Sequence, residues 1–286
     1  MKIVRYGERG NERPGILDAA GTVRDASDLV DDWSGDSLKT EVLGRIARMN
    51  LAELPVAESV SRLGCPIASP GKIVCVGLNY VDHAAESGFD IPTEPVIFFK
   101  SPTALSGPTD AIILPATSRA VDWEVELVVV IGSVVKSCRV EDAMASVAGF
   151  AVGNDITDRA WQFERGGQWS KGKCADTFAP IGPWLVTPDE LSTTVDLRIW
   201  LEKNGQSKQE SRTSKLIFSV DKIIAHLSEF MTLLPGDVIM TGTPSGVAYR
   251  KGEDEYLKDG DVVVCGIEGL GTQRCKVSSE VKSRSE

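Results

Sequence analysis

The segment Val121-Asp-Trp-Glu-Val-Glu-Leu-Val-Val-Val-Ile131 has the composition of a β-strand that begins among acidic side chains and continues into a hydrophobic core. Alternate side chains of a strand share a face, so Asp122, Glu124 and Glu126 are expected to point the same way. From Leu127 onward the segment is apolar on both faces, which is typical of a buried strand. Two interpretations remain open at this point. The carboxylates form a solvated acidic face at a strand end, or they are buried and need a cation to neutralise them.

Another carboxylate follows a second apolar strand, Phe150-Ala-Val-Gly-Asn-Asp-Ile156, which carries Asp155 near its end. A helix is expected to begin directly after this strand. Together with Glu124 and Glu126, Asp155 would make a set of three carboxylates with no suitable cysteine or histidine nearby in the sequence. A donor set made only of oxygen atoms favours Mg²⁺ or Mn²⁺ over Zn²⁺, in octahedral geometry with positions left for water.

The chain has only two histidines, so each of them is informative. His83 and Glu86 end the segment Gly77-Leu-Asn-Tyr-Val-Asp-His-Ala-Ala-Glu86, a loop running into a helical turn on which these two side chains would face each other. A carboxylate beside imidazole fixes its tautomer and raises its basicity, as a general base for water requires. A solvated surface pair is the alternative, because this spacing is common. His226 lies on the flank of an amphipathic helix and is interpreted as structural.

Cationic and polar side chains follow the second acidic strand. Arg159 and Gln162 are three residues apart on the helix expected after Asp155, and Lys171 and Lys173 come next. Such groups close to a metal site could hold a substrate carboxylate or stabilise a developing oxyanion. Each of them taken alone could equally be an ordinary solvated side chain.

Two glycine-rich segments invite an anion-binding interpretation. Thr241-Gly-Thr-Pro-Ser-Gly246 follows an apolar strand and either brings backbone N–H groups close to an anion or forms an ordinary tight turn. Gly167-Gln-Trp-Ser-Lys-Gly-Lys173 fits the pattern of a nucleotide-binding P-loop. However, Cys174 replaces the hydroxyl residue that would reach Mg²⁺, and Pro180 and Pro183 preclude a long helix after it. We therefore do not expect nucleotide binding.

Composition excludes several classes of protein. The 286 residues carry a formal charge of −10, which argues against nucleic acid as a partner because phosphate binding depends on clustered Lys and Arg. The first residues include no apolar signal core, and the most apolar stretch, residues 127–135, is about half the length of a membrane span. We expect a cytoplasmic protein without a membrane partner. The six cysteines form no C-x-x-C pair and are expected to be reduced, buried thiols.

The strand and helix patterns predict an α+β protein, with a small N-terminal α/β domain and linker at residues 1–69 and a strand-rich domain at residues 70–286. In the first part, strands are expected at 2–6 and at 15–24, the latter with a turn at Ala20-Gly21, and a helix from Asp36 or Ser37. Later strands are expected at 73–76, 96–99, 123–131, 150–156, 197–202, 238–241, 262–267 and 274–277. Helices are expected at 140–147, 158–163 and 219–231. Asn204-Gly205 predicts a type I′ hairpin, and the tail after Val277 is expected to fray.

Taken in order, several segments of the chain resemble the fumarylacetoacetate hydrolase family. Each segment is weakly specific by itself, but the ordered set is highly specific and covers roughly residues 70–280. The matching segments are Gly77-Leu-Asn-Tyr-Val-Asp-His83, Phe98-Phe-Lys-Ser-Pro102, Asp122-Trp-Glu-Val-Glu126, Gly153-Asn-Asp155, Lys173 and Pro235-Gly-Asp-Val-Ile-Met-Thr-Gly-Thr-Pro-Ser-Gly246.

The resemblance implies a mixed β-sheet roll around one divalent ion, Mg²⁺ or Mn²⁺, in a catalytic domain at residues 70–286. It also implies a homodimer or homotetramer. The implied metal ligands are Glu124, Glu126 and Asp155. The implied catalytic residues are His83 and Glu86, which would activate water, and Lys173, which would stabilise the oxyanion. The implied substrate contacts are Arg159, Gln162, Thr243, Tyr80 and Lys100.

One departure from the family pattern affects the metal site. The mammalian namesake has a fourth carboxylate ligand shortly before the catalytic histidine, whereas this sequence offers Asn79 and Tyr80 there. A three-carboxylate site, as in the smaller bacterial members, is therefore expected. The N-terminal stretch Tyr6-Gly-Glu-Arg-Gly-Asn-Glu-Arg-Pro-Gly15 and the chain length are similar to the bacterial branch that acts on 2,4-diketo-3-deoxy sugar acids. That branch cleaves compounds derived from L-rhamnonate or L-fuconate to pyruvate and lactate.

The mechanism implied is hydrolysis of a carbon–carbon bond in a 2,4-dioxo acid. The metal would bind the C1 carboxylate and C2 oxo group, water activated by His83 would attack C4, and pyruvate would leave as its enolate. A decarboxylase, a hydroxydienoate isomerase or a lyase could use the same enolate, and these are the principal alternatives. An alternative of another class is a metal-binding protein without catalytic activity.

Overall fold

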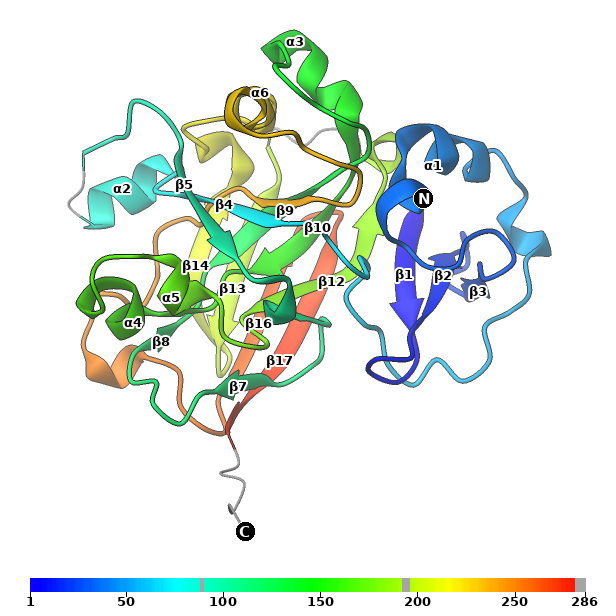
Figure 1. The fold of residues 1–286 in the computed structure, drawn as a ribbon. Helices are drawn as coiled ribbons and strands as arrows, with labels where there is room; N and C mark the ends of the chain where they lie inside the picture. Colours follow the sequence, from blue (N-terminus) through cyan, green and yellow to red (C-terminus); the bar gives the residue numbers. More distant parts are fainter. Residues whose placement is uncertain (88–89, 192–195, 281–286) are drawn as a thin grey trace.

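The computed structural model describes residues 1–87, 90–191 and 196–280, and it has an α+β fold with two packed β-sheets (Figure 1). Within these residues the longer sheet has ten strands, in the order β3-β2-β1-β12-β10-β9-β15-β4-β5 with β6 beside β12. The shorter sheet has five, in the order β14-β13-β16-β17-β7. Both sheets are mixed, because β15 runs parallel to β4 and β17 runs parallel to β7 among otherwise mostly antiparallel pairs. The predicted fold class is confirmed.

The strands of the longer sheet are β1 (Lys2–Tyr6), β2 (Arg13–Leu17), β3 (Val23–Asp25), β4 (Ile73–Gly77), β5 (Val96–Lys100), β6 (Leu105–Ser106), β9 (Val125–Ile131), β10 (Val147–Asn154), β12 (Ala179–Val186) and β15 (Val238–Met240). The strands of the shorter sheet are β7 (Ile112–Leu114), β13 (Arg198–Lys203), β14 (Gln206–Arg212), β16 (Val262–Ile267) and β17 (Gly271–Ser279). A separate two-stranded ladder joins β8 (Val121–Asp122) to β11 (Thr157–Asp158). The α-helices are α1 (Thr40–Ile46), α2 (Val81–Ser87), α3 (Val140–Ala143), α4 (Arg159–Glu164), α5 (Ser170–Lys173) and α6 (Val220–Phe230).

Strand β9 lies between β10 and β15 and is buried along its whole length. Val129 and Ile131 pack into the hydrophobic core that the two sheets share, whereas Val128 and Val130 pack into a second core on the other face of the longer sheet. Burying each of these side chains contributes roughly 2 kcal/mol to folding. The predicted two-sided burial of this segment is confirmed, and it fixes which way the acidic residues at the start of the strand must point.

The N-terminal segment adds strands to the edge of the longer sheet (Figure 1). Lys2 and Ile3 of β1 pair with Val186 and Leu185 of β12, and Ile3 belongs to the same core as Val128. The residues expected to be a linker return to this segment through the bridges of Leu63 to Tyr6 and Val56 to Arg24. The division into folding units at residues 1–69 and 70–286 stays a prediction.

Most predicted elements are present, with four differences in their bounds or type. The strand predicted at 123–131 begins only at Val125, because Trp123 and Glu124 lie outside the ladder. The helix predicted at 140–147 ends as α3 at Ala143 and continues as a 3₁₀ turn, and the helix predicted from Asp36 or Ser37 is likewise a 3₁₀ turn (Gly35–Leu38) followed by α1. Strand β17 runs to Ser279, so the predicted frayed tail starts too early, and residues 281–286 lie outside the described part.

Strand β12 was not predicted at all, because Pro180 and Pro183 argue against a strand inside a sheet. The ladder between β10 and β12 contains a register shift between Phe150 and Val152, and such irregularities accommodate proline residues. The hairpin predicted at Asn204-Gly205 is confirmed, since both residues have the positive φ angles of 53° and 76° that a type I′ turn requires.

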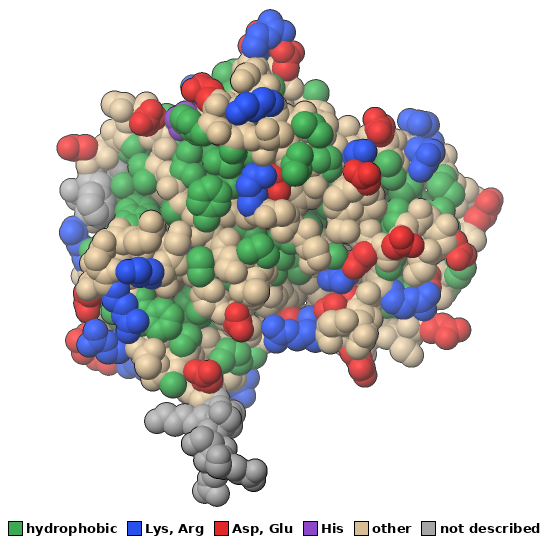
Figure 2. Space-filling model, viewed as in Figure 1, with side chains coloured by type: hydrophobic (Ala, Val, Ile, Leu, Met, Phe, Trp, Pro, Cys, Tyr) green, Lys and Arg blue, Asp and Glu red, His purple; other side chains and the backbone are tan. Residues whose placement is uncertain are grey.

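No helix in the described part of the chain is long and apolar enough to cross a membrane. Lys and Arg side chains are interspersed with Asp and Glu side chains on the face shown in Figure 2. None of the six cysteines, all of which are described, takes part in a disulfide. Cys65, Cys75, Cys265 and Cys275 are buried as expected, whereas Cys138 and Cys174 are partly exposed.

Candidate active site

Glu124, Glu126 and Asp155 converge at the start of β9 and the end of β10. Each offers a carboxylate oxygen within 4.8 Å of the others, and all three residues are buried. The local pairing explains this convergence, because Gly153 of β10 is paired with Glu126 and the Asp155 N–H donates to the Glu124 carbonyl at 2.8 Å. Asn154 holds the backbone of Glu124 in this position, since its side-chain oxygen accepts from the Glu124 N–H at 2.9 Å. The predicted convergence is therefore present, and the solvated acidic face is excluded.

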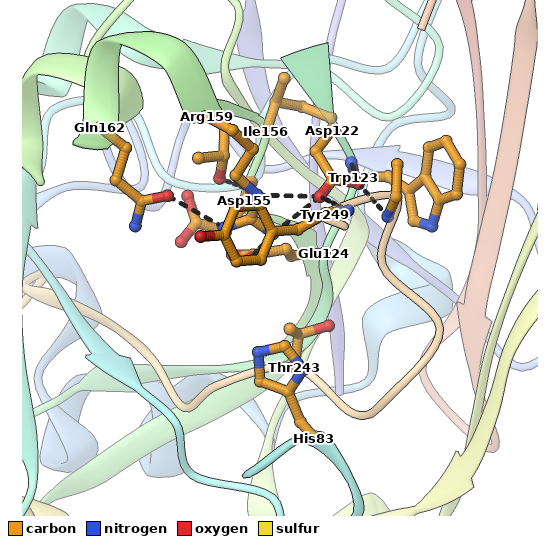
Figure 3. Close-up of polar contacts among 12 residues, drawn as sticks. His83, Asp122, Trp123, Glu124, Asp155, Ile156, Arg159, Gln162, Thr243 and Tyr249 are labelled. Atoms are coloured by element: carbon orange, nitrogen blue, oxygen red, sulfur yellow. Dashed lines mark hydrogen bonds and ion pairs between the residues drawn. The ribbon is translucent and has the colours of Figure 1, made fainter. Parts of the chain in front are cut away.

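Three buried cations touch this carboxylate cluster, and Figure 3 shows one of them, Arg159, beside Glu124. Lys173 donates to Glu124 at 2.5 Å and to Asp155 at 2.6 Å, and Lys100 donates to the other oxygen of Asp155 at 2.5 Å. The Arg159 guanidinium reaches Glu124 at 2.5 Å. Glu126 has no cation among these contacts and accepts only the N–H of Gly242, at 2.7 Å.

The surrounding charges have opposite effects on the pKa values of Glu124 and Glu126. Burial would raise the pKa of Glu124, but Arg159 and Lys173 outweigh it and hold that pKa well below its usual range. Burial raises the pKa of Glu126 well above its usual range, and the neighbouring Asp155 and Glu124 raise it further. Glu126 is thus the carboxylate whose charge is compensated least by the protein itself.

The residues present fit a hard divalent cation. The donors are all carboxylate oxygens in a buried position, which suits Mg²⁺ or Mn²⁺ better than a softer ion. The uncompensated charge on Glu126 supplies a physical reason for an ion at this point, because crowded carboxylates inside a protein repel one another strongly unless a cation joins them.

His83 lies on α2 across the pocket from this cluster, beside Thr243 (Figure 3). Its Nδ1 is buried and without a hydrogen-bond partner, and the nearest Glu86 carboxylate oxygen is 3.8 Å away. His83 and Glu86 therefore face each other as predicted, but their separation is longer than a hydrogen bond. A modest inward movement of Glu86 would give Nδ1 its partner.

Glu86 is held by groups other than His83. Its carboxylate accepts from the Gly246 N–H at 2.8 Å and pairs with Lys251 at 3.0 Å. Burial would raise the pKa of Glu86, yet His83, Gly246 and Lys251 together lower it to about 2. Glu86 is therefore ionised under all ordinary conditions. The neighbouring Asp82 fixes the same helix through Ser211 at 2.9 Å and Lys215 at 3.1 Å.

One cavity joins the two parts of the site. Seven of the predicted site residues line it, namely His83, Glu124, Glu126, Arg159, Gln162, Lys173 and Thr243. Asp155 lies directly behind Glu124 and Lys173, and Glu86 lies behind His83. The predicted residues therefore form one site, although they come from five separate segments of the chain.

Two predicted substrate contacts do not line the cavity. Lys100 is fully committed to Asp155 and to the carbonyl of Ile156 at 3.1 Å. Tyr80 is completely buried, and its hydroxyl has no hydrogen-bond partner. Burial raises the pKa of Tyr80 far above its usual range, and Glu126 and Asp82 add to this effect. Both residues support the site from behind rather than facing its interior.

The glycine-rich loop after β15 contacts carboxylates of the protein itself. The Gly242 N–H donates to Glu126 and the Gly246 N–H donates to Glu86. Backbone N–H groups of this loop thus approach anions, as one of the two interpretations predicted, but the anions are carboxylates of the protein. Thr243 donates its hydroxyl to the Val125 carbonyl at 2.9 Å. The P-loop-like segment forms the short helix α5, which carries Lys173 to the carboxylates.

Sequence reasoning missed the aromatic side of the cavity and the role of Asp122. Phe98, Phe163, Trp169 and Tyr249 all line the cavity, but no spacing in the sequence links them. Asp122 does not join the cluster of Glu124, Glu126 and Asp155, because the strand is interrupted after it. It binds Arg159 at 2.8 Å and the N–H groups of Ala248 and Tyr249, and so orients a side chain of the cavity wall. His226 lies on α6 with its ring edge-on to Phe230, which agrees with a structural role.

Comparison with known proteins gives consistent matches over almost the whole chain. Residues 72–278 match the family described as fumarylacetoacetate (FAA) hydrolase C-terminal. A 2,4-didehydro-3-deoxy-L-rhamnonate hydrolase from Sphingomonas sp. (strain SKA58) is 48% identical over 279 residues, covering 97% of this chain and 96% of its own.

Two solved structures illustrate the range of chemistry among the relatives. A 2-hydroxyhepta-2,4-diene-1,7-dioate isomerase from Mycobacterium marinum has a TM-score of 0.75 and 34% identity, covering 99% of this chain and 100% of its own. Maleylpyruvate hydrolase from Sphingobium sp. SYK-6, in complex with manganese(II) and pyruvate, has a TM-score of 0.79 and 29% identity. The match covers 98% of this chain and 100% of that chain.

Proposed function

The chain belongs to the fumarylacetoacetate hydrolase family, and from this premise we propose that it is a metal-dependent enzyme that hydrolyses a carbon–carbon bond of a 2,4-diketo acid. One observation carries the proposal. Three buried carboxylates meet at one point, and a histidine with a carboxylate behind it faces them across the same cavity. This arrangement supports a cation site and a site for activating water that face each other across one cavity.

Glu124, Glu126 and Asp155 are the proposed ligands of one Mg²⁺ or Mn²⁺ ion. The manganese in the maleylpyruvate hydrolase structure supports a divalent ion in a relative of this fold. When bound, such an ion supplies Lewis-acid stabilisation for negative charge that develops on substrate oxygen atoms.

His83 is the proposed general base for the attacking water, and Glu86 the group that orients it. The imidazole lines the cavity with Nδ1 turned towards Glu86, so the other ring nitrogen is the one available to remove a proton from water. Glu86 is fixed by Gly246 and Lys251, and its negative charge favours the imidazolium that forms.

Lys173 is the proposed stabiliser of negative charge on the reacting part of the substrate. Its ammonium group is buried between Glu124 and Asp155 and lines the cavity, where its charge acts at full strength because water is largely excluded. Arg159, Gln162 and Thr243 are the proposed substrate contacts, since all three line the cavity wall.

A 2,4-diketo-3-deoxy sugar acid of the L-rhamnonate or L-fuconate type is the proposed substrate, giving pyruvate and lactate. The name of the Sphingomonas relative supports this choice, because identity to that protein extends over nearly the full length of both chains. A homodimeric or homotetrameric state and a cytoplasmic location remain predictions of the same reasoning.

Glu86→Gln is expected to lower kcat by about 100-fold, by nearly the same factor from about pH 7.5 to about pH 9. The pKa of Glu86 is depressed to about 2, so its charge is present throughout that range and is lost only as the pH falls towards that value. The glutamine side chain can still accept from the Gly246 N–H, which preserves the fold. Measuring kcat against pH checks this. A deficit that disappears at either end of the range would contradict the assigned role.

An isomerase is the second candidate, favoured by the likeness to the Mycobacterium marinum structure. An isomerase needs only proton transfer at the site, whereas a hydrolase needs a base that activates water against C4. A decarboxylase or a lyase would share the metal site, and a non-catalytic metal-binding protein would show no turnover at all.

The deciding experiment screens synthetic 2,4-dioxo acids with Mg²⁺ or Mn²⁺ in an assay that couples pyruvate release to a second enzyme. A hydrolase releases pyruvate together with one equivalent of a second carboxylic acid. Pyruvate release that stops on chelation and returns with added Mn²⁺ would support the proposal. Turnover of a hydroxydienoate without pyruvate release would favour the isomerase, and no turnover of any acid would reject both enzymes.

A further inference from the structure

The cations of the cavity wall are already engaged by carboxylates of the protein. Arg159 donates to Asp122 at 2.8 Å, to Glu124 at 2.5 Å and to Gln162 at 3.0 Å, so all three guanidinium nitrogens have partners. Lys173 is shared between Glu124 and Asp155. Within the described residues, no other Lys or Arg lines the cavity. A substrate group that lies away from the proposed metal ligands therefore meets no Lys or Arg on this wall that lacks a carboxylate partner of its own.

The formal charge of the site also disfavours a second carboxylate on the substrate. Its ionised side chains are the carboxylates of Asp122, Glu124, Glu126 and Asp155 and the cations of Lys100, Arg159 and Lys173, which leaves a net charge of −1. One dication changes this to +1, and a single substrate carboxylate then brings it to zero. A second carboxylate would leave a buried negative charge without a partner, which is strongly unfavourable.

One wall of the cavity is aromatic. The rings of Phe98 and Trp169 are 5.6 Å apart, those of Trp169 and Phe163 are 6.1 Å apart, and those of Phe163 and Tyr249 are 5.0 Å apart. The four rings thus form one continuous surface. Trp169 owes its place to Gly77, where any side chain would come within 2.6 Å of the indole ring.

The polar groups on this wall are neutral. The Gln162 carbonyl accepts from Arg159, so its amide has only N–H donors left to offer. The Tyr249 ring lines the cavity and carries a hydroxyl that can donate or accept. The next cations along the chain are turned elsewhere, since Lys251 pairs with Glu86 and Arg250 lies over the Tyr249 ring at 5.3 Å.

We propose that the aromatic wall determines which tails this site accepts beyond C4, and that Phe163 within it is a specificity-determining residue that excludes a second carboxylate. The inference rests on the proposed function and adds to it the residue that sets the choice of tail. It separates this chain from enzymes whose substrates are dioates, such as the one that names the Mycobacterium marinum structure. A tail with an alkyl end and a hydroxyl would place the alkyl group on the rings and the hydroxyl near Gln162 or Tyr249.

The test uses two substrates that differ at one carbon, 2,4-dioxoheptanoate and 2,4-dioxoheptanedioate. Pyruvate release is followed from both with the Mn²⁺-loaded enzyme. We expect kcat/KM to be at least about 100-fold higher for the monocarboxylate, because the dioate would bury an unpaired charge against the rings. Equal values, or a preference for the dioate, would overturn the inference while the release of pyruvate would still uphold the proposed hydrolase.

Phe163→Arg supplies a cation at the wall and is expected to raise kcat/KM for the dioate by about 10-fold or more while lowering it for the monocarboxylate. Phe163→Leu is the matched variant, which keeps an apolar surface of smaller size and should keep the preference for the monocarboxylate. If Phe163→Arg does not fold, Phe163→Gln tests the same point without a charge and should weaken the preference. An unchanged preference in every folded variant would remove Phe163 as the determinant.

Binding separates this inference from the proposed function. If neither acid releases pyruvate, the hydrolase proposal fails, and the tail preference is then read from calorimetric titration of both acids into the Mn²⁺-loaded protein. Tighter binding of the monocarboxylate, reversed in Phe163→Arg, would support the selection. Equal binding of the two acids would overturn it.

Discussion

Replacing Glu126 with alanine is expected to reduce metal-dependent turnover by about 1,000-fold or more while the chain remains folded. Among the described residues, no Lys or Arg touches Glu126, and its carboxylate accepts the Gly242 N–H. Its negative charge is therefore the one that a bound cation must balance. The measurement is the rate of pyruvate release at saturating Mn²⁺ in the variant and in the wild type.

Stability measurements show whether the loss comes from the metal site or from unfolding. Without metal, Glu126→Ala and Glu126→Gln should melt close to the wild type, because removing one of three crowded carboxylates offsets the lost bond to Gly242. With Mn²⁺ the wild type should gain stability by mass action, and both variants should gain much less. Full activity in Glu126→Ala, or in extensively chelated wild type, would reject the proposed role of the cluster.

His83→Ala is expected to lower the hydrolysis of 2,4-dioxo acids by about 100- to 10,000-fold, the range that general base catalysis contributes. Metal binding should be unchanged, since His83 lies on the opposite side of the cavity from the carboxylates. The measurement is kcat for pyruvate release, together with a Mn²⁺ titration of the same variant.

The chain offers a matched control for this variant in its other histidine. His226→Ala removes an imidazole that packs against Phe230 on α6, away from the cavity, and should leave kcat unchanged. Decarboxylation of oxaloacetate provides a second comparison, because that reaction needs no water activated against a carbonyl. If His83→Ala lost both reactions equally, or lost neither, the assignment of His83 to water activation would be wrong.

The acidic strand shows how far strand geometry could be read from the sequence. Glu124 and Glu126 are two residues apart, and the valines beyond them fill both faces, so their burial and common direction follow from the pleat. The same reasoning fails at Asp122, two residues earlier. The ladder is interrupted at Trp123 and Glu124. Glu124 still lies beside Glu126 because Asn154 and the Asp155 N–H hold its backbone, whereas Asp122 binds Arg159 instead.

Contacts between segments that are distant in the sequence were the second part of the site that could not be predicted. The pairing of His83 with Glu86 and of Arg159 with Gln162 follows from helical spacing, and both pairs are present. The aromatic wall could not be predicted, because Phe98, Phe163 and Tyr249 come from β5, α4 and the loop after β15. Tyr80 and Lys100 lie next to site residues in sequence, yet both are used behind the cavity. Adjacency in sequence does not decide which way a side chain faces.

The account depends most directly on one divalent ion held by three carboxylates. Crystals grown with Mn²⁺ and measured at a wavelength where manganese scatters anomalously would locate the ion without reference to activity. The account predicts a single strong peak bonded to oxygen atoms of Glu124, Glu126 and Asp155, with Lys173 still beside them. A peak bound by other residues, or none at this position while these carboxylates point away from one another, would contradict it.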